Sequence, residues 1–105
     1  MNTPEMGASL NELQSYIAAV EVERGFDRQT VIEKCLLLGE EVGELFKAVR
    51  YQSAMGIDVT SIRPEVAEEI ADVLIFLISI ANRCGVDMHG ALLMKERKNQ
   101  GRTWK

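Results

Sequence analysis

Acidic side chains dominate the middle of the chain, in a spacing that could support metal-dependent chemistry. Two pairs, Glu41 with Glu44 and Glu69 with Asp72, share the same i, i+3 spacing. Residues three apart lie on the same face of a helix, so each pair presents two carboxylates on one side if its segment is helical. The stretch from 40 to 72 holds only three basic residues against eight acidic ones. The acids are Glu40, Glu41, Glu44, Asp58, Glu65, Glu68, Glu69 and Asp72.

Helix-start and helix-stop signals divide the chain into four expected helices. The signals are capping boxes at Ser9–Glu12 and Thr30–Glu33, a stop at Gly25, Pro64 in a first turn, and Asp87 as a cap. The expected helices cover 10–24, 31–51, 64–84 and 88–99, with a loop over 52–63. No segment shows the alternation typical of a strand. The sequence therefore predicts an all-α, four-helix bundle as a single domain over 1–105, with a loose N-terminus at 1–8 and a tail at 101–105.

The four acids can be placed relative to the apolar stripes of their helices. On a helical wheel, Glu41 and Glu69 fall beside the stripes of the second and third helices, and Glu44 and Asp72 lie about 60° further round. If these helices pack antiparallel, the four carboxylates converge near the contact edge. Like charges gathered there repel one another, and a hard divalent cation such as Mg²⁺ or Mn²⁺ would offset that repulsion. The alternative is that the acids are solvated surface charge.

The third helix is apolar over more than one stripe, which favours burial on several sides. Its stripe of Val66, Ile70, Val73, Leu77 and Ile80 is broadened by neighbouring apolar residues. Because a chain of 105 residues has few elements to cover such a helix, we expect a subunit interface. Burial within the chain's own bundle is the alternative. The two cysteines lie in apolar runs, and we expect both to be small core residues.

The fourth helix carries the opposite charge. Lys95, Asn99 and Arg102 share one helix face at i, i+4 and i+7. Lysine and arginine neutralise phosphate oxygens, and asparagine hydrogen-bonds to phosphate or sugar. This face therefore indicates a phosphate-binding element. The alternative is that cations near a helix C-terminus complement the helix dipole.

Overall composition narrows the classes of partner. The formal net charge is −4 and the isoelectric point is near 5.0. Both values argue against a general nucleic-acid or anionic-membrane binder, which needs a basic surface. The longest apolar run covers 73–78, too short to cross a bilayer, and no signal-peptide pattern opens the chain. We therefore expect a cytoplasmic protein with no nucleic-acid or membrane partner.

The chain resembles the MazG-like nucleoside triphosphate pyrophosphohydrolases, all-α enzymes that act on nucleotides. The resemblance covers roughly residues 9–104. The matching blocks are Gly39-Glu40-Glu41-Val42-Gly43-Glu44-Leu45, Glu68-Glu69-Ile70-Ala71-Asp72-Val73-Leu74, Ala81-Asn82-Arg83-Cys84-Gly85-Val86-Asp87, and Lys95 with Asn99 and Arg102. Either acidic block alone is a weak motif, whereas the two in this order, followed by the basic end, are fairly specific.

The resemblance implies an activity and an assembly. Such enzymes cleave a nucleoside triphosphate between the α- and β-phosphates, by attack of a metal-activated water, into a monophosphate and pyrophosphate. They act as homodimers, or as tetramers made of two dimers, so the bundle would be assembled through dimerisation. The substrate would be a nucleoside triphosphate and the cofactor Mg²⁺, with Mn²⁺ as a substitute.

The resemblance also implies roles for individual residues. Glu41, Glu44, Glu69 and Asp72 would bind the metal, and Glu41 or Glu44 would orient or deprotonate the water. Glu40 would be a further acid near the site. Tyr51 and Phe76 would contact the base, or serve ordinary packing. Lys95, Asn99 and Arg102 would hold the phosphates.

Two related enzyme activities and one non-catalytic role compete with this hypothesis. The same metal ligands occur in dUTPase-like enzymes and in phosphoribosyl-ATP pyrophosphohydrolases, and a non-catalytic dimerisation module could keep the fold. A di-iron carboxylate bundle fits poorly, because it needs Glu-x-x-His pairs and Val86 stands three residues before His89, the only histidine.

Overall fold

The computed structural model describes residues 2–56, 60 and 64–104. Within these ranges the chain forms four helices and no strand, which confirms the all-α prediction. Half of the expected loop, residues 57–59 and 61–63, and the last residue of the tail lie outside the described residues. The helices are α1 (Leu10–Arg24), α2 (Val31–Gln52), α3 (Val66–Arg83) and α4 (Met88–Gln100).

The ends of the first two helices follow the sequence signals. Ser9 and Glu12 form a complete capping box at the start of α1, and Gly25 ends the helix in a left-handed conformation, with φ of 79°. The hydroxyl of Thr30 accepts a hydrogen bond from the backbone N–H of Glu33 at the start of α2. Local chemistry therefore sets where these helices begin and where α1 ends.

The start of the later helices differs from the prediction. Pro64 precedes α3 rather than standing in its first turn, and Glu65 takes the N-cap position. Asp87 is the N-cap residue of α4, as expected, but its carboxylate makes no capping hydrogen bond. The first turn of α4 is consequently held by contacts from outside the helix.

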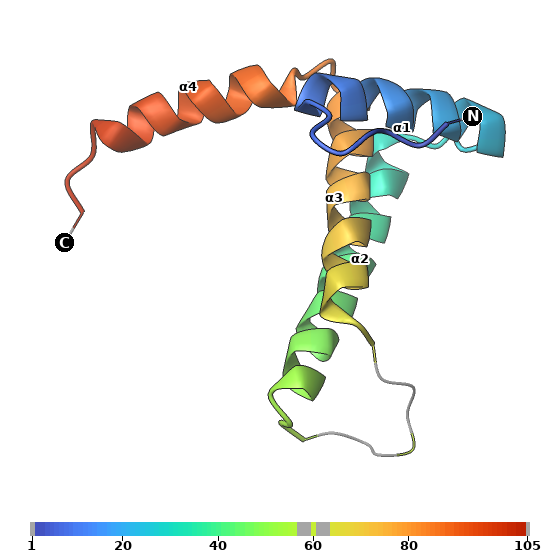
Figure 1. Cartoon of the computed structure of the whole chain (residues 1–105), viewed down its shortest axis with the longest axis vertical. Coiled ribbons are helices and arrows are strands. Elements are labelled where there is room, and N and C mark those ends of the chain that lie inside the picture. Colours follow the sequence, from blue (N-terminus) through green and yellow to red (C-terminus); the bar gives the residue numbers. More distant parts are fainter. Residues whose placement is uncertain (1, 57–59, 61–63, 105) are drawn as a thin grey trace.

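Helices α2 and α3 form a long antiparallel hairpin (Figure 1). At the end where α2 begins and α3 ends, α1 packs across the hairpin, mainly on α3, and α4 extends in the opposite direction. The buried apolar residues lie between α1, α2 and α3, whereas no described residue of α4 is buried. They are Ile17, Val20, Ala48, Tyr51, Ile78 and Ala81.

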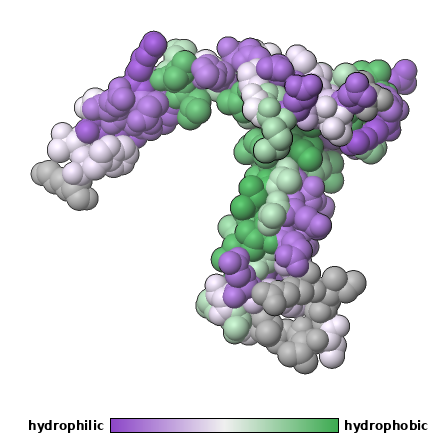
Figure 2. Space-filling model, in the orientation of Figure 1, coloured by the Kyte–Doolittle hydropathy of each residue, from purple (hydrophilic) through white to green (hydrophobic). Residues whose placement is uncertain are grey.

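One side of the hairpin is apolar and uncovered (Figure 2). Phe46 is 70% exposed and Ile70 54%, although Ile70 belongs to the third-helix stripe that we expect to be buried. Cys35 and Cys84 are exposed free thiols, so the prediction that both are core residues is wrong. No other element of the described chain covers the side of α2 that carries Phe46. The large apolar surface is typical of a subunit contact.

A single side chain ties the α3–α4 turn to α1. The Gln14 Nε2 donates hydrogen bonds to the Val86 carbonyl (2.8 Å) and the Asn82 Oδ1 (3.1 Å). The Gln14 Oε1 accepts one from the Met88 N–H (3.0 Å), and the Asn82 Nδ2 donates to the Gln14 carbonyl (2.9 Å). This clasp holds the first turn of α4 and thereby sets the direction in which the helix leaves the hairpin.

None of the four helices combines the length and the apolar character that a bilayer crossing requires, as far as the described residues go.

Candidate functional site

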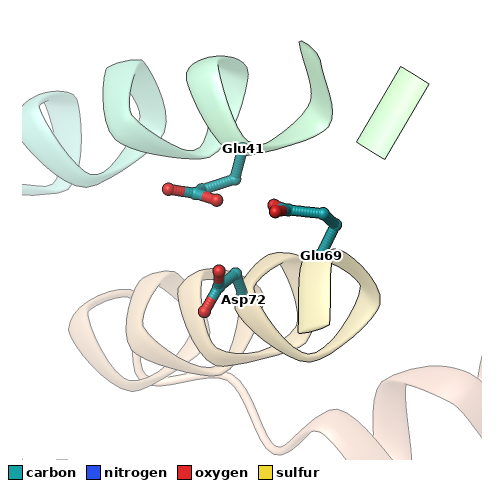
Figure 3. Close-up of side chains that lie close together, drawn as sticks. All are labelled: Glu41, Glu69 and Asp72. Atoms are coloured by element: carbon teal, nitrogen blue, oxygen red, sulfur yellow. The ribbon is translucent and has the colours of Figure 1, made fainter. Parts of the chain in front are cut away.

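Three carboxylates meet across the α2–α3 contact. Glu41 reaches down from α2 toward Glu69 and Asp72 on α3 (Figure 3). One oxygen from each residue lies within 4.8 Å of the others, and all three side chains are half-buried. Glu69 and Asp72 share a helix face through their i, i+3 spacing, and the antiparallel packing brings Glu41 opposite them.

The cluster has no counter-ion of its own in the described part of the chain. Both ion pairs found there involve Glu21, a different carboxylate. Burial, followed by the negative charges of Asp72 and Glu69 and then of Glu44 and Glu40, raises the pKa of the Glu41 carboxyl above its ordinary value. Bringing these acids together therefore costs free energy that an external cation would recover.

The donor set fits a hard divalent cation. Three carboxylates from two rigid helices offer oxygen ligands, with no imidazole or thiolate in the group. Oxygen ligands suit Mg²⁺ and Mn²⁺, whereas structural zinc sites use nitrogen and sulfur. The residues that could hold such an ion are therefore Glu41, Glu69 and Asp72.

Two further acids of α2 lie beside the cluster rather than in it. Glu40 and Glu44 are exposed, although both are near enough for their charges to act on Glu41. The structure thus brings together three of the four carboxylates expected to converge. Glu44, one turn further along α2, remains accessible to solvent and to a ligand.

The basic residues of α4 lie far from the acids within one chain. Lys95 is exposed on α4, which extends away from the hairpin (Figure 1), and Arg102 is exposed just after the end of that helix. The Asn99 Oδ1 is shielded from solvent and has no hydrogen-bond partner among the described residues. Lys95 and Asn99 lie one turn apart on α4, whereas Arg102 lies beyond the end of the helix, so the expected three-residue helix face is not complete.

Comparison with models of protein families shows to which family the chain belongs. The model of the MazG nucleotide pyrophosphohydrolase domain matches residues 29–103, which is most of the chain. The chain belongs to the MazG family. The family suggested by the sequence motifs is thereby confirmed, and its members depend in general on a divalent metal. No curated protein matches the chain.

The MazG match covers α2, α3 and α4 in full and begins after α1. The carboxylates therefore all fall in the matched part. The nucleotide pyrophosphohydrolase character of the family agrees with a site built from hard oxygen ligands. The helix that packs over the start of α2 and the end of α3 lies outside the match.

The two aromatic residues expected to contact the nucleotide base lie on opposite sides of the carboxylate cluster. Phe76 follows Asp72 by one helical turn and is half-buried. Tyr51 is buried ten residues after Glu41, about 15 Å along α2 in the other direction, with the cations of Lys47 and Arg50 near its ring. One chain therefore brings Phe76, but not Tyr51, to the end of the cluster nearer α1.

A buried lysine of α2 escaped the sequence analysis. Lys34 stands two turns before Glu41, and its side chain is only 6% exposed. It faces a cavity that Phe76 also lines. The helical spacing could have placed Lys34 on the same face of α2 as Glu41. Its surroundings depend on α1, whose position the helical pattern does not give.

Proposed function

We propose that the chain is a Mg²⁺-dependent nucleotide pyrophosphohydrolase. It cleaves a ribo- or deoxyribonucleoside triphosphate between the α- and β-phosphates and releases a monophosphate and pyrophosphate. The observation that carries this proposal is the convergence of Glu41, Glu69 and Asp72 without a compensating cation, in a chain of the MazG family. A triphosphate and these carboxylates repel each other, so a cation between them makes binding possible.

The carboxylates take different roles in this proposal. Glu41, Glu69 and Asp72 hold the metal, with Glu44 as a fourth ligand. Bound Mg²⁺ supplies charge neutralisation and lowers the pKa of water that it coordinates. Glu44 and Glu41 are the candidates to orient the attacking water and accept its proton, since Glu44 is exposed and the pKa of Glu41 is raised. Glu40 adds negative charge beside them.

The phosphate-binding residues require a second copy of the chain. Because α4 points away from the carboxylates, we propose that a homodimer, or a tetramer of two dimers, brings α4 of one copy to the site of another. Lys95 and Arg102 then stabilise charge on the phosphates, and Asn99 hydrogen-bonds to them. The exposed apolar side of the hairpin supports such an assembly. In the same arrangement Tyr51 contacts the base of a nucleotide bound mainly by the partner, while Phe76 contacts the base bound by its own copy.

A nucleotide panel tests the proposal. The purified protein is incubated with each common ribo- and deoxyribonucleoside triphosphate in Mg²⁺, and pyrophosphate and monophosphate are measured. We expect both products in equal amounts, and none when EDTA is present. Orthophosphate with a diphosphate would place the cleavage elsewhere, and no product from any nucleotide would contradict the proposed function. Cleavage confined to dUTP would indicate the dUTPase-like alternative.

A further inference from the structure

A small cavity lies between α1, the start of α2 and the end of α3. Its volume is about 240 Å³, and it is walled largely by apolar and aromatic side chains, among them Tyr16, Phe26 and Phe76. Flat apolar walls with few polar groups are typical of pockets that take a planar ring. The polar groups that it does contain are therefore the ones that would distinguish one ring from another.

The charges of the groups beside the cavity do not sum to zero. The Arg83 guanidinium donates to the Glu21 carboxylate (2.6 Å), the Ser79 hydroxyl (2.6 Å) and the carbonyls of Gln29 and Phe26. Arg83 is thus fully engaged, and it neutralises Glu21. The second cation near Glu21 is Lys34, whose Nζ lies 3.7 Å from the carboxylate. The group of three therefore carries one excess positive charge, and Arg24, which also lines the cavity, adds another.

The ammonium of Lys34 has the Glu21 carboxylate as its charged partner, at 3.7 Å, which is beyond hydrogen-bond length. Its Nζ lies 5.4 Å from the centroid of the Phe26 ring and 5.3 Å from that of Phe76, and it makes no hydrogen bond to any described residue. An ammonium has three donors, which a ligand in the cavity could use. The cavity is thus prepared for a ligand that brings an electron-rich oxygen to Lys34.

The cavity lies next to the carboxylate cluster along α2 and α3. Phe76 lies one turn beyond Asp72 on α3, and Lys34 lies two turns before Glu41 on α2, which is about 10 Å along the helix. A nucleotide whose phosphates are held at the carboxylates can direct its base toward α1. The edge of the base farthest from the sugar then enters the cavity first, where Lys34 stands.

Resting on the proposed function, we propose that Lys34 selects nucleotides whose base carries a carbonyl oxygen on this distal edge. Uracil, thymine, guanine and hypoxanthine present such an oxygen, and the ammonium donates a hydrogen bond to it. Cytosine and adenine present an amino group there, so that two donors face each other and neither is paired. A site built to hydrogen-bond one group rejects the analogue that lacks it.

Two pairs of nucleotides test this selection, since each pair differs in oxygen against amino at the distal carbon and in the proton on the adjacent ring nitrogen. They are dUTP with dCTP, and dITP with dATP. We expect wild-type kcat/KM to favour the carbonyl member of each pair by about tenfold or more. Lys34→Met keeps Glu21 paired with Arg83 and removes the ammonium, so both ratios should fall toward one. Lys98→Met, a lysine exposed on α4, is the matched control and should keep the wild-type ratios.

The outcomes separate this proposal from the one on which it rests. Pyrophosphate release with ratios near one in the wild type, or ratios that persist in Lys34→Met, would overturn the role of Lys34 and leave the hydrolase intact. If no nucleotide is cleaved, the proposed function fails, and binding decides the role of Lys34. Calorimetry with the α,β-imido analogues of dUTP and dCTP should then still show the preference in wild type and its loss in the variant.

Folding of the variant is checked independently. Lys34→Gln provides a second neutral variant that keeps a polar end group, and circular dichroism with urea unfolding reports whether either variant is folded. A relaxed ratio in a folded variant supports the proposal. An unchanged ratio in folded Lys34→Met contradicts it.

Discussion

Two carboxylate sites lie along the same helical hairpin. Cations surround the carboxylate of the first site, and further carboxylates surround that of the second. Glu21 is buried at the α1 end beside two cations, Arg83 and Lys34, and its charge is compensated. Glu41 lies nearer the middle beside Glu69 and Asp72, and its charge is reinforced. The first site is complete within the chain and holds three helices together. The second site gathers like charges with no cation paired to them among the described residues, and in the proposed function a cation from solution completes it.

The two pKa shifts express this difference. Burial by itself raises the pKa of Glu21, but hydrogen bonds from Arg83 and Ser79 and the charges of Arg83 and Lys34 outweigh it, and the net pKa is lowered. Burial and the neighbouring acids act in the same direction on Glu41, whose pKa is raised. Ionisation is therefore favoured by the fold at Glu21 and opposed by it at Glu41.

The largest expected effect is loss of catalysis at the uncompensated site. Glu41→Gln and Asp72→Asn remove a charged ligand without changing side-chain volume, so kcat/KM should fall by about 1,000-fold or more. Pyrophosphate release measures it. Glu23→Gln, an exposed acid of α1 outside both sites, is the control and should retain activity. Full activity in both ligand variants would refute the metal-site assignment.

The next effect is on stability, at the compensated site. Glu21→Gln leaves Arg83 and Lys34 without their carboxylate, and breaking a buried pair in this way should cost about 3 kcal/mol. Urea unfolding at pH 7 measures the change. Glu23→Gln again serves as the control, with an expected change near zero. An equally small change for Glu21→Gln would mean that the compensation contributes little to the fold.

Binding of the cation should stabilise the protein through the second site alone. A ligand present at one hundred times its dissociation constant adds about 2.7 kcal/mol to the free energy of unfolding. We therefore expect saturating Mg²⁺ to raise the melting temperature of the wild type and of Glu21→Gln, but not that of Glu41→Gln. Equal stabilisation of all three proteins would place the ion elsewhere.

The smallest effect is an opposite pH dependence of the two sites in metal-free protein. The folded pKa of Glu41 is raised, so its contribution to stability is present below the unfolded pKa, near 4.5, and is lost as pH rises through the folded value. Glu41→Gln should therefore stabilise the metal-free protein near neutral pH, with little change at pH 4.

At Glu21 the folded pKa is lowered, so its contribution is present above 4.5 and is lost as pH falls through the folded value. The destabilisation by Glu21→Gln should accordingly shrink in acid. Urea unfolding between pH 3 and 8, in EDTA, measures both variants. Parallel pH profiles for the two would contradict the contrast between the sites.

Much of the second site could be predicted from the sequence, because its determinants are local. Capping residues such as Ser9 and stops such as Gly25 set helix ends, and the i, i+3 spacing alone places Glu69 and Asp72 together. Glu44 was harder to place, since a helical wheel locates it only to within tens of degrees. Its exposed position beside the cluster depends on the actual crossing of α2 and α3.

The first site could not be predicted, because its partners come from three helices. Glu21, Lys34 and Arg83 lie far apart in sequence, and no periodic pattern indicates that α1 crosses the hairpin at their level. The exposure of Cys35 was misjudged for a related reason. A helical pattern shows that a face is apolar, but not whether the same chain or another copy covers it.

The position of α1 has a consequence for how such enzymes diversify. This helix precedes the part of the chain that matches the family, yet with Phe26 it forms much of the cavity wall and supplies the Gln14 clasp. If the cavity takes the base as we propose, substitutions in α1 would alter which nucleotides are admitted while the acidic blocks stay unchanged. Exchanging residues 10–28 between relatives is accordingly a direct way to engineer the preference of the enzyme, and inherited variation there is a route by which it can evolve.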